Sequence, residues 1–173
     1  KTWEKTFEGS GSARGYSVQQ TTDGGYIIVG ETWSEWNHDV YLIKTDASGN
    51  KTWQKTFGGR GYNESDSYAG GYSVQQTTDG GYIIVGYAQD DESIDIYLIK
   101  TDTLGNKTWE KYFGRVSYDI NGLLRAADEY GFSVQQTTDG GYIIVGKKPL
   151  TPYINAIYLI KTDEKGQVTW VRD

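Results

Sequence analysis

The chain lacks cysteine and methionine, and it contains one histidine and two prolines. Without cysteine, disulfides and thiolate metal or redox sites are excluded. With His38 as the sole histidine, a metal site built from several histidines of one chain is excluded as well. The absence of both sulfur residues removes the side chains most prone to oxidation, which favours a thermostable protein of hot or oxidising surroundings.

Long apolar runs and excess positive charge are also missing. The longest apolar stretches are far too short for a membrane span or a signal peptide, so no membrane insertion is predicted. The chain begins at Lys1 rather than Met, which predicts a processed N-terminus. The net charge of −6 argues against a nucleic-acid partner, because phosphate binding requires clustered Lys and Arg.

What the chain does have is internal repetition, which must be interpreted before any local motif. The 173 residues suit a single domain, divided into repeats at approximately 1–50, 51–106 and 107–173. The repeated segments are GYSVQQTTDGGYIIVG at 15–30 and 71–86, with Phe132 in the copy at 131–146; VYLIKTD or IYLIKTD at 40–46, 96–102 and 157–163; and KTWEKTF at 1–7, KTWQKTF at 51–57, KTWEKYF at 107–113 and VTWVRD at 168–173.

Each repeat predicts four short antiparallel strands joined by tight turns. Asp23-Gly24-Gly25 is a strong hairpin signal. Tyr26–Val29 and Val40–Ile43 are apolar on both faces, so both strands must be covered on two sides. A β-propeller provides such cover, because each blade is sandwiched between neighbouring blades. The sequence therefore predicts an all-β, propeller-like fold of three four-stranded blades; a β-trefoil, also three repeats of four strands, is the alternative.

The motif DGGYIIVG, followed by DVYLIKTDASGN and KTWQKTFGG, resembles the β-propeller repeats of secreted and surface proteins of archaea and bacteria. The resemblance covers all three repeats. It implies a binding or scaffold module located outside the cell or on its surface. Relatives of this kind generally carry more repeats than three.

The strand count predicts self-association. Residues 1–7 alternate in polarity, which predicts a half-buried strand. Three blades are thus accompanied by four Trp strands, so 1–7 and 168–172 compete for one closing position. A surplus edge strand can pair with another chain. We expect a homo-oligomer, either a six-blade dimeric ring or a head-to-tail assembly, with Trp3, Phe7 and Trp170 at the assembly edge; a fragment of a longer array is the alternative.

The segments that differ between repeats are expected on one face, opposite the repeated turns. They are 8–15, 31–39, 58–71, 87–95, 114–131 and 147–156, and they are acidic and rich in aromatic residues. Such loops on a rigid scaffold commonly carry function. A protein or glycan partner would meet Trp33, Trp36, His38, Tyr62, Asp66, Tyr87, Asp90, Asp91, Tyr118 and Tyr153.

These residues support a non-enzymatic extracellular scaffold or interaction module, with a carbohydrate-binding module as the alternative. For Trp33 and Trp36, packing of the loop on its own blade is the competing interpretation. A third hypothesis, a glycoside-processing enzyme, needs two carboxylates across a cleft. The candidates for that pair are Glu35, Asp39, Asp66 and Asp119.

No cofactor is predicted. Asp90-Asp91-Glu92 offers hard oxygen ligands for Ca²⁺ but lacks the spacing of a calcium loop, so a solvated acidic loop is favoured. Asp46 and Asp102 are interpreted as turn residues that bond their own backbone. Asn50, Asn63 and Asn106 stand in N-glycosylation acceptor sequences.

Overall fold

The computed structural model of the chain describes residues 3–9, 11–34, 37–59, 68–89, 93–114, 116–118, 124–126, 128–151 and 153–172, without the side chains of 116–118 and 124–126. Over these residues the fold is all-β, as predicted. The strands are β1 (Ser12–Gln20), β2 (Tyr26–Trp33), β3 (His38–Thr45), β4 (Lys51–Phe57), β5 (Tyr68–Gln76), β6 (Tyr82–Gln89), β7 (Ile94–Thr101), β8 (Lys107–Phe113), β9 (Val116–Tyr118), β10 (Leu124–Ala126), β11 (Tyr130–Gln136), β12 (Tyr142–Thr151), β13 (Ile154–Thr162) and β14 (Val168–Arg172).

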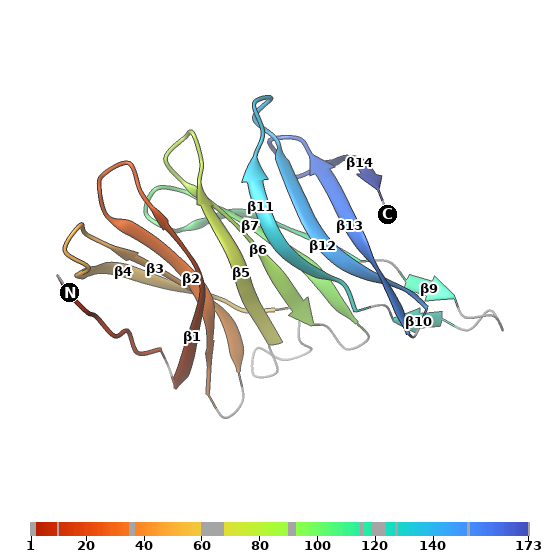
Figure 1. Cartoon of the computed structure of the whole chain (residues 1–173), viewed down its shortest axis with the longest axis horizontal. Helices are drawn as coiled ribbons and strands as arrows, with labels where there is room; N and C mark the ends of the chain where they lie inside the picture. Colours follow the sequence, from red (N-terminus) through yellow and green to blue (C-terminus); the bar gives the residue numbers. More distant parts are fainter. Residues whose placement is uncertain are drawn as a thin grey trace.

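The strands form three antiparallel sets, each paired in chain order, and in the first two sets the last strand is the Trp segment that the sequence division placed at the start of the next repeat. Unit 1 is β1–β4, unit 2 is β5–β8 and unit 3 is β11–β14. A single parallel bridge between His38 and Tyr68 joins the sheets of units 1 and 2. The three units form an open row, with the N-terminus at one end and the C-terminus at the other (Figure 1).

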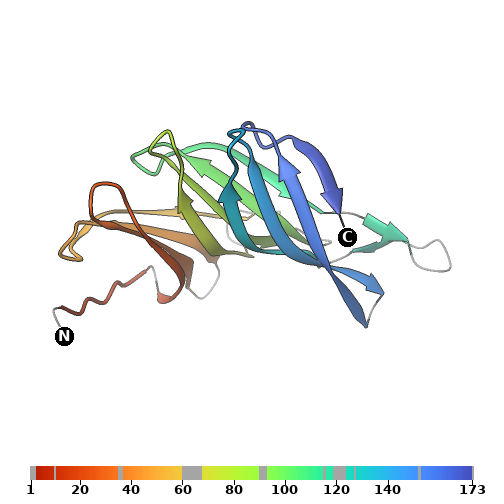
Figure 2. The ribbon, with the colours of Figure 1, turned by 45° about the horizontal axis from the view of Figure 1, so that its top comes forward.

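The core lies between the units, because each unit presents apolar side chains on both faces. Neighbouring units stack obliquely in a fan, which Figure 2 shows from a second direction. The junction of units 1 and 2 buries Ile27, Val29, Val40, Leu42, Phe57, Ala69, Val74, Tyr82, Ile84, Ala88, Tyr97 and Ile99. The junction of units 2 and 3 buries Ile83, Val85, Ile96, Leu98, Val134, Tyr142, Ile144, Tyr158 and Ile160.

The first strands of the three units, β1, β5 and β11, lie side by side along the row (Figure 1). The paired glutamines of the repeat link them. The backbone N–H of Gln76 donates to Oε1 of Gln19 at 2.6 Å, and Oε1 of Gln76 accepts from the N–H of Thr22 at 2.9 Å. The same two bonds join Gln136 to Gln75 and Thr78 across the next junction. The invariant QQ of the repeat is thus a connector between units.

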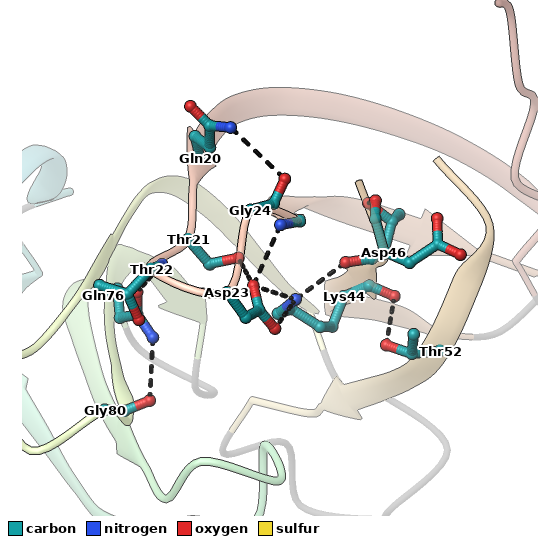
Figure 3. A network of polar contacts seen from close by, with 12 residues as sticks. Gln20, Thr21, Thr22, Asp23, Gly24, Lys44, Asp46, Thr52, Gln76 and Gly80 are labelled. Atoms are coloured by element: carbon teal, nitrogen blue, oxygen red, sulfur yellow. Dashed lines mark hydrogen bonds and ion pairs between the residues drawn. The ribbon is translucent and has the colours of Figure 1, made fainter. Parts of the chain in front are cut away.

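A lysine fixes the DGG turn of every unit and is buried in units 1 and 2; Figure 3 shows the contact of unit 1. Nζ of Lys44 lies 2.8 Å from Oδ2 of Asp23 and donates to the carbonyl of Thr45. The hydroxyl of Thr21 and the N–H of Gly25 also donate to this carboxylate. Lys100–Asp79 and Lys161–Asp139 repeat the ion pair at 2.8 Å. The conserved TTDGG and YLIKTD segments are therefore two halves of one contact.

These ion pairs predict acid lability. The hydrogen bond from Lys44 holds the pKa of Asp23 at about 2, against an ordinary value of 3.8. Burial opposes the shift at Asp79, yet Lys100 and Thr77 still lower its pKa to about 2. A lowered pKa in the folded state contributes stability above pH 3.8 that is lost as the pH falls towards 2. We expect the thermal midpoint to fall steeply across that interval.

The matched variant for this prediction replaces all three lysines, as Lys44→Met, Lys100→Met and Lys161→Met. Methionine keeps the apolar stem but cannot favour the ionised carboxylate, so the midpoint should depend less on pH between 4 and 2. Thermal unfolding followed by circular dichroism at several pH values measures both proteins. Superimposable pH profiles would contradict the assigned role of the lysines.

The second repeated turn is held by its aspartate, as the sequence indicated. Oδ1 of Asp46 accepts hydrogen bonds from the N–H groups of Ser48 and Asn50, and Gly49 adopts φ +77° to close the turn. Asp102 forms the same bonds in unit 2. Both carboxylates are thus engaged as turn residues, which confirms that interpretation.

Two local predictions were wrong. The segment 3–7 was expected as a strand, but it has no regular strand conformation, because β4 occupies the neighbouring position beside β3. The variable segments were expected as loops, whereas β12 and β13 continue into 147–156 and pair as far as Thr151 and Ile154. The segment 114–131 likewise contains the small hairpin β9–β10. Cross-strand pairing therefore extends beyond the repeated motif.

Candidate functional site

The variable segments and the repeated turns lie at opposite ends of the strands. β2 pairs Tyr26 with Thr45 at the turn end and Trp33 with His38 at the other end. β6 and β7 follow the same register, from the Tyr82–Thr101 pair to the Gln89–Ile94 pair. The prediction that the variable segments share one end of the molecule is confirmed for the described strands.

At this variable end a hollow of about 410 Å³ opens between units 1 and 2. We call it the Glu31 pocket. Its lining residues come from β1, β2 and β3 of unit 1 and from β5 and β6 of unit 2. Its lining consists of polar and aromatic side chains, namely Arg14, Tyr16, Glu31, Trp33, His38, Tyr68, Tyr72 and Tyr87.

The carboxylate of Glu31 is the polar centre of this pocket and is almost completely buried. Oε1 accepts the hydroxyl of Tyr16 at 2.6 Å, and Oε2 accepts the hydroxyl of Tyr87 at 3.2 Å. Burial, together with the Glu31 carboxylate, raises the pKa of both tyrosines above the ordinary value of 10. Both hydroxyls therefore stay protonated at neutral pH and donate to Glu31.

Aromatic rings form a stacked series along one side of the pocket. The His38 ring stacks on Tyr68 at a centroid distance of 3.9 Å and on Trp33 at 5.9 Å. The guanidinium of Arg14 lies 4.8 Å from the Trp33 ring centroid and its Nη1 lies 3.8 Å from Glu31. The pocket thus offers aromatic faces and fixed hydrogen-bonding groups to one ligand-sized space.

The structure brings together three of the predicted face residues: Trp33, His38 and Tyr87. Tyr87 is buried in the wall rather than exposed on a loop. Tyr153 is 94% exposed on the β12–β13 connection and lies outside the pocket. Tyr118 belongs to β9, whose side chains are not described. Five further residues of that prediction fall outside the described residues: Trp36, Tyr62, Asp66, Asp90 and Asp91.

The decisive pocket residues that the sequence did not single out are Arg14, Glu31 and the pair Tyr16 and Tyr72. Of these, Glu31 has a signal in the sequence, a break in the repeat. The residue after GYIIVG is Glu31 in the first copy, Tyr87 in the second and Lys147 in the third. Since only the first copy has a carboxylate there, the Glu31 pocket belongs to one junction and not to the other.

A second hollow, of about 540 Å³, lies at the turn end between units 2 and 3. It is lined by the ion pair of Lys100 with Asp79, by Trp109 and Tyr142, and by residues of the repeated turns. Because the same turn contacts recur in every unit, we assign these residues to the fold rather than to a ligand.

The predicted assembly residues lie at the two ends of the row. The Trp3 ring packs against Tyr26 of unit 1 with a centroid distance of 5.9 Å, and Phe7 is half-buried. Trp170 is 38% exposed on β14, the last strand of unit 3. The equivalent Trp and Phe residues of β4 and β8 pack into the internal junctions, against the neighbouring unit.

The asparagines of the acceptor sequences are engaged in the turns. Asn50 Nδ2 donates to Asp46, and its Oδ1 accepts from Lys5. Asn106 forms the equivalent bonds with Asp102 and Lys55. Asn63 lies outside the described residues.

No group of three or more metal-ligating side chains occurs within the described residues, and Asp90-Asp91-Glu92 falls outside them. Of the glycosidase candidates, Asp39 is described on β3, while Glu35, Asp66 and Asp119 are not, so no carboxylate separation can be assigned. The described part of the chain has no helix with the length and hydropathy needed to cross a bilayer.

Comparison with protein-family models gives no match for this chain. A search among curated proteins likewise finds no match. Function must therefore be inferred from the repeat motif and from the geometry of the chain itself.

Proposed function

We propose that this chain is a non-enzymatic scaffold or interaction module of the β-propeller type, whose units are blades and whose copies associate through their end faces. One observation carries the proposal. Val40 and Ile96 are fully buried at the internal junctions, whereas Ile157, at the same place in unit 3, is 75% exposed. The end unit thus presents a junction surface without a following unit.

The two end faces are complementary because they are the two halves of the same repeated junction. We define the leading face of unit 3 by Ile143, Val145, Ile157, Leu159 and Trp170. This face corresponds to the surfaces that units 1 and 2 bury against the unit that follows them. We define the trailing face of unit 1 by Gly15, Val18, Tyr26 and Ile28. This face corresponds to the surfaces of units 2 and 3 that pack against the preceding unit. Val18 is 63% exposed, while Val74 and Val134 are buried.

The polar groups of the two end faces are complementary as well. In the internal junctions each unit gives one glutamine oxygen to the next unit and receives another. Gln135 and Thr138 of unit 3 are equivalent to Gln19 and Thr22 of the first junction, and Gln20 of unit 1 is equivalent to Gln76. A second copy placed head to tail would restore these bonds. Such heterologous contact yields a ring if the rotation closes and a filament if it does not.

The blade interpretation is supported by the stacking of units face to face and by strands covered on both sides, which a β-trefoil does not require. The chain's location outside the cell or on its surface remains a prediction from the repeat motif.

Light scattering on the protein over a range of concentrations tests the association. We expect the mass of two copies, or a ladder of multiples. The variant Ile157→Lys should shift the mass to that of one copy, because a charge would be placed in the junction. Leu104→Lys is the control, since Leu104 is an equally exposed apolar residue on a turn of unit 2. A single-copy mass for the unaltered protein at every concentration would refute the proposal.

Gly15→Val tests the opposite face independently. A Cβ at Gly15 meets only Ile28 Cγ2, at 3.8 Å, whereas at Gly71 and Gly131 it would press on valines and isoleucines of the preceding unit. The variant should therefore fold normally as a single copy and fail to associate. Association equal to that of the unaltered protein would show that this face is not used.

The Glu31 pocket favours a second candidate function, the binding of a neutral carbohydrate. A sugar ring offers C–H faces to stacked aromatics and hydroxyls to carboxylate, guanidinium and phenol groups, and the pocket supplies all of these. In a screen of immobilised neutral glycans, Trp33→Ala should weaken binding about tenfold, equivalent to about 1.4 kcal/mol. Tyr153→Ala, outside the pocket, is the control. A blank screen for the unaltered protein would remove this candidate.

A further inference from the structure

The segment Trp3–Phe7 lies against unit 1 in the way that the fourth strand of a unit lies against the following unit. The ring of Trp3 meets Tyr26 at 5.9 Å and an interplanar angle of 60°. Trp53 of β4 meets Tyr82 at 5.8 Å and 62°. Trp109 of β8 meets Tyr142 at 5.8 Å and 60°. The three ring pairs are one contact repeated along the row.

Polar contacts repeat the correspondence. Nζ of Lys5 donates to Oδ1 of Asn50 at 3.0 Å, as Nζ of Lys55 donates to Oδ1 of Asn106 at 2.9 Å. The hydroxyl oxygen of Tyr41 also lies close to the segment, 2.7 Å from the carbonyl oxygen of Glu8. The segment is therefore positioned as the fourth strand of a unit that would stand before unit 1.

The third strand of that preceding unit can be supplied by unit 3 of another copy. There β13 is paired with β14 only along Leu159–Thr162, whereas β3 is paired with β4 from Val40 to Thr45. The segment 1–7 has the full pattern of the strand, KTWEKTF, against KTWQKTF in β4. A longer pairing would extend to Ile157, the most exposed residue of the leading face.

Side-chain chemistry also favours pairing of the segment 1–7 with β13 of another copy. In unit 1 the Tyr41 hydroxyl donates to Gln54 of β4, and in unit 2 Tyr97 donates to Glu110 of β8. The equivalent residue of β14 is Val171, which has no acceptor group. The segment 1–7 carries Glu4 at this position and so restores the acceptor found in the other two units.

We infer that copies join by strand exchange: residues Trp3–Phe7 of one copy pair with β13 of another and take the place of β14. This inference rests on the proposed self-association and specifies how it occurs. The Trp3 and Lys5 contacts seen within one copy are kept, and β14 leaves its position. The partner is a second copy of this chain, because the segment and its receiving strand belong to the same sequence.

Engineered cysteines test the exchange cleanly, since the chain has none of its own. Leu159 and Arg172 are directly opposed on β13 and β14, so Leu159→Cys with Arg172→Cys should form a disulfide within one copy. Lys5 has the same place in its segment as Arg172 in β14. Lys5→Cys with Leu159→Cys should therefore form a disulfide between copies, because the N-terminal segment and β13 lie at opposite ends of one copy (Figure 1).

We expect the oxidised 159–172 variant to lose the associated species in light scattering and to regain it on reduction. The oxidised 5–159 variant should give disulfide-linked multiples on a denaturing gel. If the oxidised 159–172 variant associates as well as its reduced form and the 5–159 variant yields no linked multiples, strand exchange is wrong while self-association stands. If the unaltered protein is a single copy throughout, the proposed function fails and this inference fails with it.

Discussion

Leu98→Ala is expected to lower the free energy of unfolding by about 2–5 kcal/mol, one of the largest effects of any single side chain in this protein. Leu98 is fully buried on β7 and belongs to the core between units 2 and 3. Truncation removes buried apolar surface and leaves a cavity, and the rigid strands on both sides limit relaxation. Urea unfolding followed by tryptophan fluorescence measures the loss.

The repeat supplies the matched control. Leu159 has the same position in unit 3 as Leu98 in unit 2, but it lies half-buried on the leading face. Leu159→Ala should therefore cost much less in dilute protein, where the face is open to water. Under associating conditions its cost should approach that of Leu98→Ala. Equal losses in dilute, single-copy protein would contradict the assignment of an open end face.

Gly86→Ala is expected to destabilise the protein by about 3 kcal/mol or more. An added Cβ would overlap the carbonyl oxygen of Gly70 on the neighbouring strand β5, and the atoms that it meets are all backbone, so no side chain can move aside. The same overlap, with Arg14 and Tyr130, explains the final glycine of GYIIVG in the other two units. Thermal unfolding should show a lowered midpoint or an unfolded protein.

Gly15→Ala serves as the comparison, because the new methyl group would make an ordinary contact with Ile28. Its stability should stay within about 0.5 kcal/mol of the unaltered protein, as for most surface substitutions. If Gly86→Ala were equally harmless, the close strand approach described for β5 and β6 would be wrong.

The sequence predicts the all-β fold well because its apolar residues leave few alternatives. Tyr26–Val29 and Val40–Ile43 have no polar face, so such strands must be covered on both sides. The equivalent strands of unit 2, at 82–85 and 96–99, are buried on both faces by the stacked units. The DGG and TDxxG turns are also predictable, since Asp23 and Asp46 bond nearby groups within the same unit. Such local and periodic signals need no knowledge of distant contacts.

The Glu31 pocket could not be predicted in the same way. Glu31 and Tyr87 lie in different units, and their hydrogen bond depends on the exact stacking of β2 against β5 and β6. On sequence alone Glu31 is one more acid in a variable segment. The irregular conformation of 3–7 was missed for a related reason: its alternating pattern suits a strand, but a strand also needs a neighbouring strand with free hydrogen-bonding groups.

The paired glutamines have a consequence for how such a chain can change in length. Every unit carries both halves of the connector, an oxygen offered forward and a backbone group that receives one. A duplicated unit is therefore compatible with its neighbours at the moment it arises, without compensating substitutions. Replacing both glutamines of an internal unit, by contrast, weakens two junctions at once. Selection acting this way would preserve the motif while leaving the number of units free to vary.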